Sequence, residues 1–286
     1  MKKIKQLMGI GLVIMALCAC TAKKGTIEGN YKEPTVQELE TAMQTVNAET
    51  LFGDPTKEDW HYTTEFDFSM DFAYKFSRQE MKVSADLAYQ LELTDPDSAS
   101  VKGKGDLGIE FQVKENGKTE KDKASGTLYN DSDYFYFNSQ DEKMKISFES
   151  LFSSFPIGLA ENEETQLDAQ ALLDYCDQYH LTLGLDTKNG LKMKLSASKK
   201  TLTSFLNEMD PTIAQIAFYM DTFVADFYIH INQDGILEAI AATINCSLNQ
   251  EGMELSLNMT FDADLTNRTV TLPNDLISYP EIDSIF

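Results

Sequence analysis

The chain has 286 residues and a formal net charge of −22, from 24 Lys and Arg against 46 Asp and Glu. So acidic a chain argues against nucleic acid as a partner, because binding to phosphates requires basic patches. The hydrophobic fraction of 42% is too high for a disordered chain. The sequence therefore predicts a folded protein with a buried core.

The first twenty residues predict the compartment. Three basic residues, Lys2, Lys3 and Lys5, precede an apolar run over residues 7–17. This run is shorter than the roughly 20 apolar residues that a transmembrane helix needs. A basic start followed by a short apolar run is typical of a secretory leader, so we expect the mature chain outside the cytoplasm.

The apolar run ends in a recognisable motif, Leu17-Cys18-Ala19-Cys20. This motif resembles the lipobox of bacterial lipoprotein precursors, although Cys18 stands where that family usually has Ala or Ser. In the family, the final Cys receives a diacylglyceryl group and becomes the mature N-terminus. The resemblance implies lipidation of Cys20, with acyl chains such as palmitate, and a lipid anchor on the extracytoplasmic face of the cell membrane. The alternative is an ordinary leader that is cleaved near Ala19.

The expected domain organisation is simple. Residues 1–19 form the leader, and their removal changes the formal charge from −22 to −25, so acyl chains rather than a basic patch would hold the protein at a membrane. Residues 20–34 lack apolar periodicity and predict a lipidated tether. No Pro/Gly-rich linker divides residues 35–286, which predict a single domain. Its two cysteines, Cys176 and Cys246, can either pair or stay as buried thiols.

The hydrophobic periodicity predicts one helix and then long strands. Thr35-Val36-Gln37-Glu38 matches a capping box at the start of a helix over residues 35–50. From Trp60 onward the apolar period becomes two, which is typical of half-buried strands. The expected elements that follow are first six strands, over 66–76, 81–93, 107–113, 126–129, 134–137 and 143–148. The middle of the chain predicts an apolar stretch over 151–160, a helix over 167–179, a hairpin of 181–185 and 191–195, and a helical block over 201–222 broken at Pro211. The last third predicts strands over 223–232, 236–248 and 253–265 and a short strand that ends at Pro273.

These elements predict an α+β fold, in which a few helices pack on the concave face of a large curved antiparallel sheet shaped like a half-barrel. The element order, together with the segments Asp234-Gly235-Ile236-Leu237 and Val270-Thr271-Leu272-Pro273, resembles the bacterial lipoprotein-carrier superfamily of LolA, LolB and LppX-type proteins. In that superfamily a half-barrel and a helical lid enclose a cavity for acyl chains. The resemblance implies this architecture and a cavity, and it implies no individual binding residue.

The helical block over residues 201–222 carries more apolar surface than a single helix stripe needs. We expect five of its side chains to line or cover an apolar ligand site: Phe205, Met209, Ile213, Ile216 and Met220. The alternative is that these side chains fill an ordinary closed core.

The sequence contains no Gly-x-Ser-x-Gly, His-Glu-x-x-His or P-loop motif, so we expect no enzymatic activity, cofactor or metal. The function we expect is that of a membrane-anchored extracytoplasmic lipoprotein that binds an acyl chain, a lipid or a similar apolar ligand between its sheet and its helices. The alternative is a closed-core interaction module, in which acidic strand faces or an edge strand recruit another envelope protein.

Overall fold

The computed structural model describes most of the domain expected at residues 35–286 and a short stretch before it. The described residues are 25–47, 50–54, 60–95, 100–139, 142–148, 150, 168–209, 217, 219–250, 252–266 and 268–282. The expected leader, Cys20 and the apolar stretch over residues 151–160 lie outside them.

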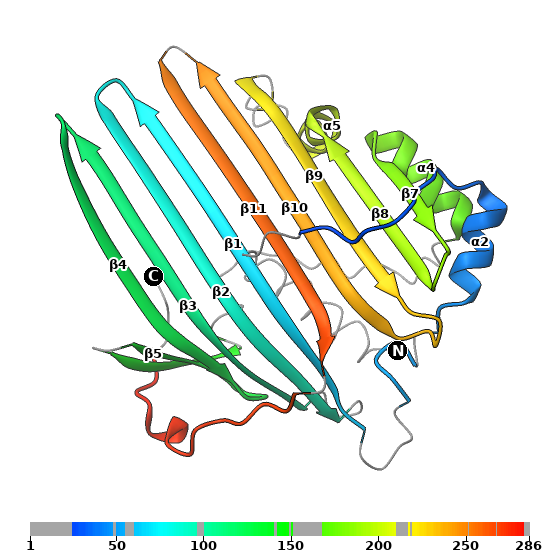
Figure 1. The fold of residues 1–286 in the computed structure, drawn as a ribbon, viewed down its shortest axis with the longest axis horizontal. Coiled ribbons are helices and arrows are strands. Elements are labelled where there is room, and N and C mark those ends of the chain that lie inside the picture. The colour runs from blue at the N-terminus through cyan, green and yellow to red at the C-terminus, as the bar shows by residue number, and fades with distance from the viewer. Residues whose placement is uncertain are drawn as a thin grey trace.

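One antiparallel sheet of eleven strands forms the body of the protein, in the order β6-β5-β4-β3-β2-β1-β11-β10-β9-β8-β7 (Figure 1). Neighbouring strands in the sheet are consecutive in the chain except at the centre, where the last strand pairs with the first, and β6 and β7 lie at opposite edges. The strands are β1 (Tyr62–Phe76), β2 (Gln79–Asp95), β3 (Ser100–Glu115), β4 (Lys118–Asn130), β5 (Tyr134–Ser139), β6 (Lys143–Ser147), β7 (Thr182–Asp186), β8 (Leu191–Ser198), β9 (Met220–Ile231), β10 (Leu237–Gln250) and β11 (Met253–Thr266).

Within the described residues, the helices α2 (Val36–Gln44), α4 (Ala169–Tyr179) and α5 (Lys199–Met209) lie near one side of this sheet, and a short 3-10 turn, η1 (Leu276–Ser278), lies near the C-terminus. The expected capping box is confirmed: Thr35 accepts from the Glu38 backbone N–H, and the Glu38 carboxylate accepts from the Thr35 N–H. The helix after it ends at Gln44, earlier than the expected residue 50.

The period of two gives the sheet two different faces. Along β11, from Met253 to Leu265, every second residue is apolar and the residues between them are mostly polar. The register of β11 with β1 and β10 places the apolar residues of the three strands side by side on the same face of the sheet. Leu183 and Leu195 identify that face as the one toward the helices, because they pack with Leu39 of α2 and Ala169 of α4. We call this apolar face the inner face and the opposite one the outer face.

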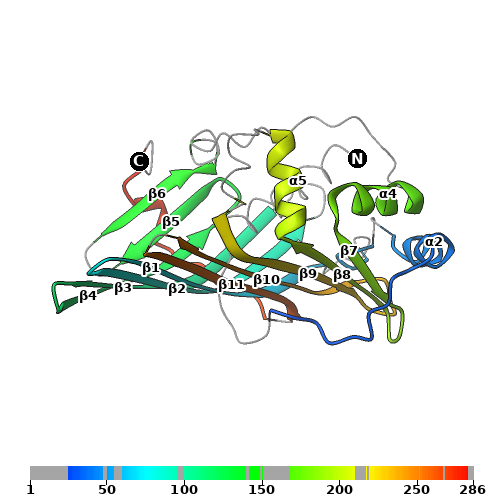
Figure 2. The same cartoon turned by 90° about the horizontal axis from the view of Figure 1, so that it is seen from above.

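The expected fold class is confirmed: the structure is an open, curved antiparallel sheet with helices over one face. Figure 2 shows α4 and α5 on the same side as β5 and β6, where the sheet curls over at that end. The hairpin of β7 and β8 is also confirmed, with Asn189 and Gly190 at φ 64° and 105°. These angles suit the tight turn that an Asn-Gly pair makes.

Several elements differ from the sequence-based expectation. β3 and β4 are longer than expected, because Gly103 and Gly105 interrupt the apolar pattern of β3, and the first half of β4 is rich in Lys, Glu and Asp. Met220 starts β9 rather than ending a helix. No strand ends at Pro273, since the described chain there has no strand pairing until a bridge at Glu281.

The chain covers one position at each edge strand of its own sheet, and the stretch of β4 over residues 118–125, which does not pair with β5, is left as an open edge. At the β7 edge, Lys32 and Leu185 exchange two backbone hydrogen bonds of 3.0 and 2.8 Å. At the β6 edge, the Lys145 N–H donates to the Pro280 carbonyl, and the Ile282 N–H donates to the Lys145 carbonyl. At these positions the backbone groups that an incoming strand would use are already bonded.

The two cysteines of the domain do not pair. Cys176 is a buried free thiol on α4, and Cys246 is a partly buried free thiol on β10. Burial raises the pKa of both thiols, so both are poor nucleophiles at neutral pH.

Candidate functional site

The inner face is covered near the β2–β3 turn and open near the opposite ends of the strands. Its covered part is a core cluster of Tyr62, Leu87, Tyr89, Leu91, Leu93 and Val101, all at most 8% exposed. Within it, the Tyr89 hydroxyl donates to the Asn130 side chain. This cluster anchors the sheet and leaves no surface for a ligand.

The open part, which we call the distal apolar face, lies toward the β1–β2, β3–β4 and β10–β11 turns, at the top of Figure 1. Its residues are Phe72, Tyr74, Phe76, Met81, Val83, Phe111, Val113, Cys246, Leu248, Leu255 and Leu257. None of them is buried, and Phe76, Phe111 and Val113 are 47%, 42% and 44% exposed. Large exposed apolar side chains gathered in one patch are typical of a binding surface.

The strand register makes this patch continuous across five strands. One row runs Leu248, Leu255, Tyr74, Met81 and Val113, from β10 to β3. The row beside it runs from Cys246 through Leu257, Phe72 and Val83 to Phe111 in the same way.

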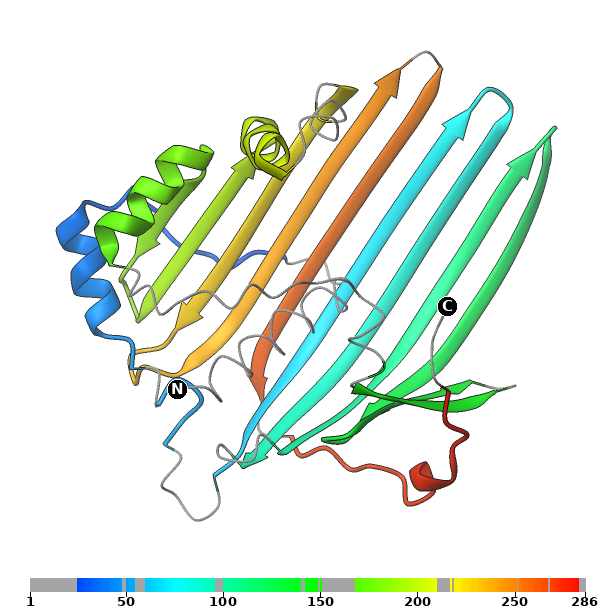
Figure 3. The same cartoon turned by 180° about the vertical axis from the view of Figure 1, so that it is seen from behind.

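Beyond β3 the character of the inner face changes. The register continues the two rows into Glu120 and Asp122 of β4, both of which are exposed. The apolar patch therefore has a carboxylate border on the β4 side. Figure 3 views the sheet from the side opposite to Figure 1, with α2, α4 and α5 gathered at the β7–β9 end.

The structure places the five predicted ligand-binding residues unequally. Phe205 lies on α5, where its ring stacks on Tyr179 of α4 with ring centroids 4.4 Å apart. Met220 is half-buried at the start of β9, beside Leu248 of the distal apolar face. Met209 ends α5, and Ile213 and Ile216 lie outside the described residues. Of this set, Phe205 thus packs α5 against α4, and Met220 lies at the rim of the distal apolar face.

A groove of about 720 Å³ lies elsewhere, between α2 and the β7–β8 and β9–β10 turns. Ten of its lining residues are Thr, Gln, Glu, Asn or Gly, and only Ala42 and Leu191 are apolar. This groove does not provide the apolar cavity expected between sheet and helices. Sequence reasoning missed both the groove and the distal apolar face, because periodicity shows which side chains share a face and not which strand ends are covered.

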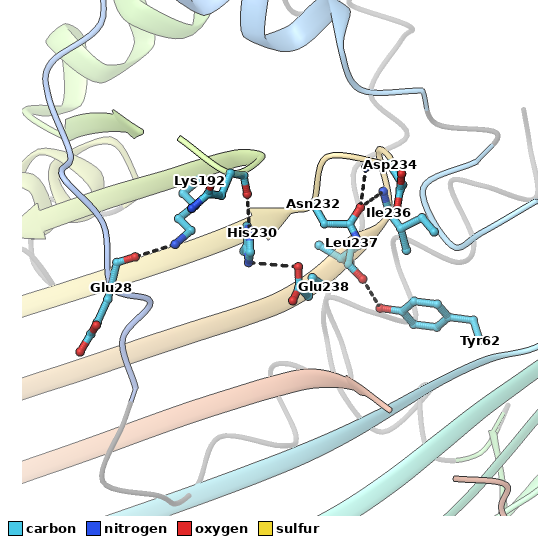
Figure 4. A network of polar contacts seen from close by, with 10 residues as sticks. Glu28, Tyr62, Lys192, His230, Asn232, Asp234, Ile236, Leu237 and Glu238 are labelled. Atoms are coloured by element: carbon cyan, nitrogen blue, oxygen red, sulfur yellow. Dashed lines mark hydrogen bonds and ion pairs between the residues drawn. The ribbon is translucent and has the colours of Figure 1, made fainter. Parts of the chain in front are cut away.

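Side-chain hydrogen bonds hold one wall of the groove, as Figure 4 shows. The Asn232 amide oxygen accepts from the backbone N–H groups of Asp234 and Ile236 in the β9–β10 turn. Tyr62 donates to the Leu237 carbonyl, which ties the turn to β1. In the same view Lys192 donates to the Glu28 carbonyl and so holds the N-terminal segment against the sheet.

The outer face is polar and acidic. Glu65 faces Asp264, and Asp67 faces Asp262, across neighbouring positions of β1 and β11. The pKa of Asp67 is raised, mainly because partial burial disfavours the ionised carboxylate, and Glu65 and Asp264 add charge repulsion. Among the described residues, no group of three or more His, Cys, Asp or Glu side chains could hold a metal ion.

No helix within the described part of the chain is long and apolar enough to cross a membrane. No protein-family model matches the chain, and no curated protein matches it in sequence. Among solved structures, LprF from Mycobacterium bovis is similar with a TM-score of 0.30 and 14% identity, over 85% of this chain and 99% of that one.

A second similar structure is a beta-barrel-like protein of a domain of unknown function from Brucella abortus. It has a TM-score of 0.16 and 8% identity, over 73% of this chain and 99% of that one. At these TM-scores the similarity does not indicate a function, and the distal apolar face is the feature of the described chain that does.

Proposed function

We propose that the protein is a membrane-anchored extracytoplasmic lipoprotein that binds an acyl chain or another apolar ligand on its inner face, without catalysing a reaction. The observation that carries the proposal is the distal apolar face, with two continuous rows of partly exposed apolar side chains. An acyl chain laid across these rows would remove apolar area from water on both partners, which is favourable by about 25 cal/mol per Å².

The residues at the β4 end of the two apolar rows limit the charge that a ligand can carry there. Glu120 and Asp122 border the patch on the β4 side, so an anionic group there would meet like charge. We therefore favour a ligand whose polar end is uncharged, or lies away from β4. No catalytic constellation accompanies the patch in the described residues, and the proposed activity is binding and release.

The alternative of an interaction module is less well supported. Recruitment of a partner strand requires an open sheet edge. Lys32 and Glu281 form bridges with β7 and β6, at Leu185 and Lys145, so the open edge left is the charged stretch of β4 over residues 118–125. The half-exposed inner face also fits a closed core poorly, and a closed core is what that alternative assumes.

Replacing Phe111 by Ser tests the proposal. We expect affinity for the uncharged fluorophore N-phenyl-1-naphthylamine to fall by about tenfold or more, because a buried Phe side chain contributes roughly 1.5–3 kcal/mol. Phe111 is 42% exposed. Its loss is therefore expected to change the free energy of unfolding little, within the roughly 0.5 kcal/mol typical of surface substitutions.

The matched control is Val224→Ser, because Val224 is 48% exposed and lies on the outer face of β9. Fluorescence titration and denaturant melts are measured on both variants. Equal probe affinity in the two variants, or no uptake by the wild-type domain, would rule out the distal apolar face as a binding site.

A further inference from the structure

We infer that the outer face of β9–β11 is the side turned toward the anchoring membrane, so that the distal apolar face opens away from it. The inference rests on the acylation of Cys20 in the proposed function and does not depend on ligand binding. It follows from where the N-terminal segment, residues 25–32, lies on the sheet.

The segment is fixed at its first described residue. The Gly25 N–H donates to the buried Asp262 carboxylate on β11 at 2.9 Å. Gly25 has a φ of +48°, and a side chain there would collide with Thr243 and press tightly on Thr260. Thr260 is in the middle of β11, so Gly25 lies near the centre of the outer face rather than at a rim.

The rest of the segment is held as far as the β7 edge. The Asn30 N–H donates to Asp186 at 2.8 Å, and Tyr31 donates to the Ile27 carbonyl at 2.7 Å. The Tyr31 ring packs on Tyr228, and burial raises the pKa of Tyr31 to about 12. In Figure 2 this segment runs along the face of the sheet opposite to α4 and α5.

The number of residues between the anchor and this segment is small. Only five residue steps separate Cys20 from Gly25. A fully extended chain advances at most about 3.6 Å per residue, so Cys20 lies within about 18 Å of Gly25. An acyl group on Cys20 therefore brings the bilayer surface close to the centre of the outer face.

That reach is too short for the inner face to turn toward the bilayer. The distal end of β11 is seven residues from Thr260, or roughly 23 Å along the strand. The sideways route crosses three strand spacings from β10 to β7, which is roughly 14 Å. It must then pass around the β7 edge to the other face, which adds roughly the 10 Å that separates packed sheet layers. Both routes exceed about 18 Å, and the shorter way past the end of β11 at Thr266, roughly 20 Å from Thr260, leads to the covered part of the inner face and not to the distal apolar face.

Charge does not supply the orientation. Glu65, Asp67 and Asp264 make this face acidic, so an anionic bilayer repels it, although screening limits the repulsion beyond a Debye length of about 8 Å. The short anchor alone sets the geometry. A ligand on the distal apolar face would then be exchanged on the side away from the anchoring bilayer.

Energy transfer on the acylated full-length protein in vesicles tests this inference. A fluorescent amino acid is placed either at Asn258, on the outer face, or at Phe111, on the inner face, with an acceptor on the lipid headgroups. We expect higher transfer from position 258 than from position 111. Equal transfer, or higher transfer from position 111, would overturn the inference. Neither result would contradict the proposal that the inner face binds an apolar ligand.

Undocking the N-terminal segment supplies the second arm. The double variant Asp262→Ala, Tyr31→Ala removes the Gly25 contact and the ring contact with Tyr228, so the chain between Cys20 and its first contact with the sheet becomes longer. We expect the difference between the two label positions to be lost. The control, Asp264→Ala with Tyr219→Ala, changes the same residue types outside these contacts and should keep the difference.

The two possible failures are distinguishable. Absence of transfer at both positions, in protein that stays off the vesicles, would overturn the anchor and this inference together. Ligand uptake by the unanchored domain is measured separately, so its loss would overturn only the proposed binding activity.

Discussion

Replacing Cys20 by Ala is expected to abolish incorporation of labelled palmitate and to release the mature chain from the membrane fraction. The acyl chains are the only proposed anchor, and each buried methylene contributes about 0.8 kcal/mol to membrane binding. The acidic body, with a formal charge of −22 for the whole chain, offers no electrostatic substitute.

Cys18 provides a matched control for this prediction, because it lies two residues earlier in the same motif. Cys18→Ala restores the small residue that lipoboxes usually have there, and we expect it to keep the label. Metabolic labelling followed by membrane fractionation measures both variants. Label retained on Cys20→Ala would contradict the lipoprotein assignment.

A second large effect is expected at Gly103 in β3. A methyl group at this position would collide with the Tyr89 hydroxyl and the Asn130 side-chain oxygen, and the two groups are hydrogen-bonded to each other. Overpacking of a core costs typically about 1–3 kcal/mol, and a buried polar group that loses its partner costs a further ~1–3 kcal/mol. We therefore expect Gly103→Ala to lower the free energy of unfolding by at least about 2 kcal/mol.

Gly108→Ala is the control on the same strand, because a methyl group there meets no atom within 4 Å. Gly in a strand interior is unfavourable by roughly 0.5–1 kcal/mol relative to Ala, so this variant should be unchanged or slightly more stable. Urea melts of the two variants measure the difference. Similar midpoints would show that the packing around Tyr89 is looser than described.

The sequence was most informative where one face of a strand is apolar throughout. The alternation from Phe66 to Phe76 and from Met253 to Leu265 predicts β1 and β11, because burial of one face imposes a period of two. It does not predict that these two strands pair at the centre of the sheet. That pairing joins the start of the domain to its end, and no local pattern encodes it.

Other elements were missed for identifiable physical reasons. Gly103 and Gly105 lack side chains because the Tyr89 ring fills that space, so β3 loses its apolar pattern where packing is tightest. The first half of β4 is exposed on both faces, and its pairing with β3 forms it. Met220 was expected on a helix because its apolar neighbours continue the helical spacing beyond the end of α5.

The candidate site could be predicted only in part. An apolar inner face follows from the alternation of residues such as Phe72 and Val83, but its exposure depends on where the helices pack. The N-terminal segment has no apolar periodicity. Its backbone N–H groups donate to side chains of the sheet, as Gly25 does to the Asp262 carboxylate and Asn30 to that of Asp186, and no local sequence pattern indicates such contacts.

Native mass spectrometry of the domain, produced without its leader and purified without detergent, tests the binding of an apolar ligand most directly. We expect a population whose mass exceeds that of the polypeptide by one lipid or acyl-chain molecule. This adduct should be released by organic solvent and diminished in the Phe111→Ser variant. A single species at the polypeptide mass, in protein that also takes up no apolar probe, would contradict the proposed function.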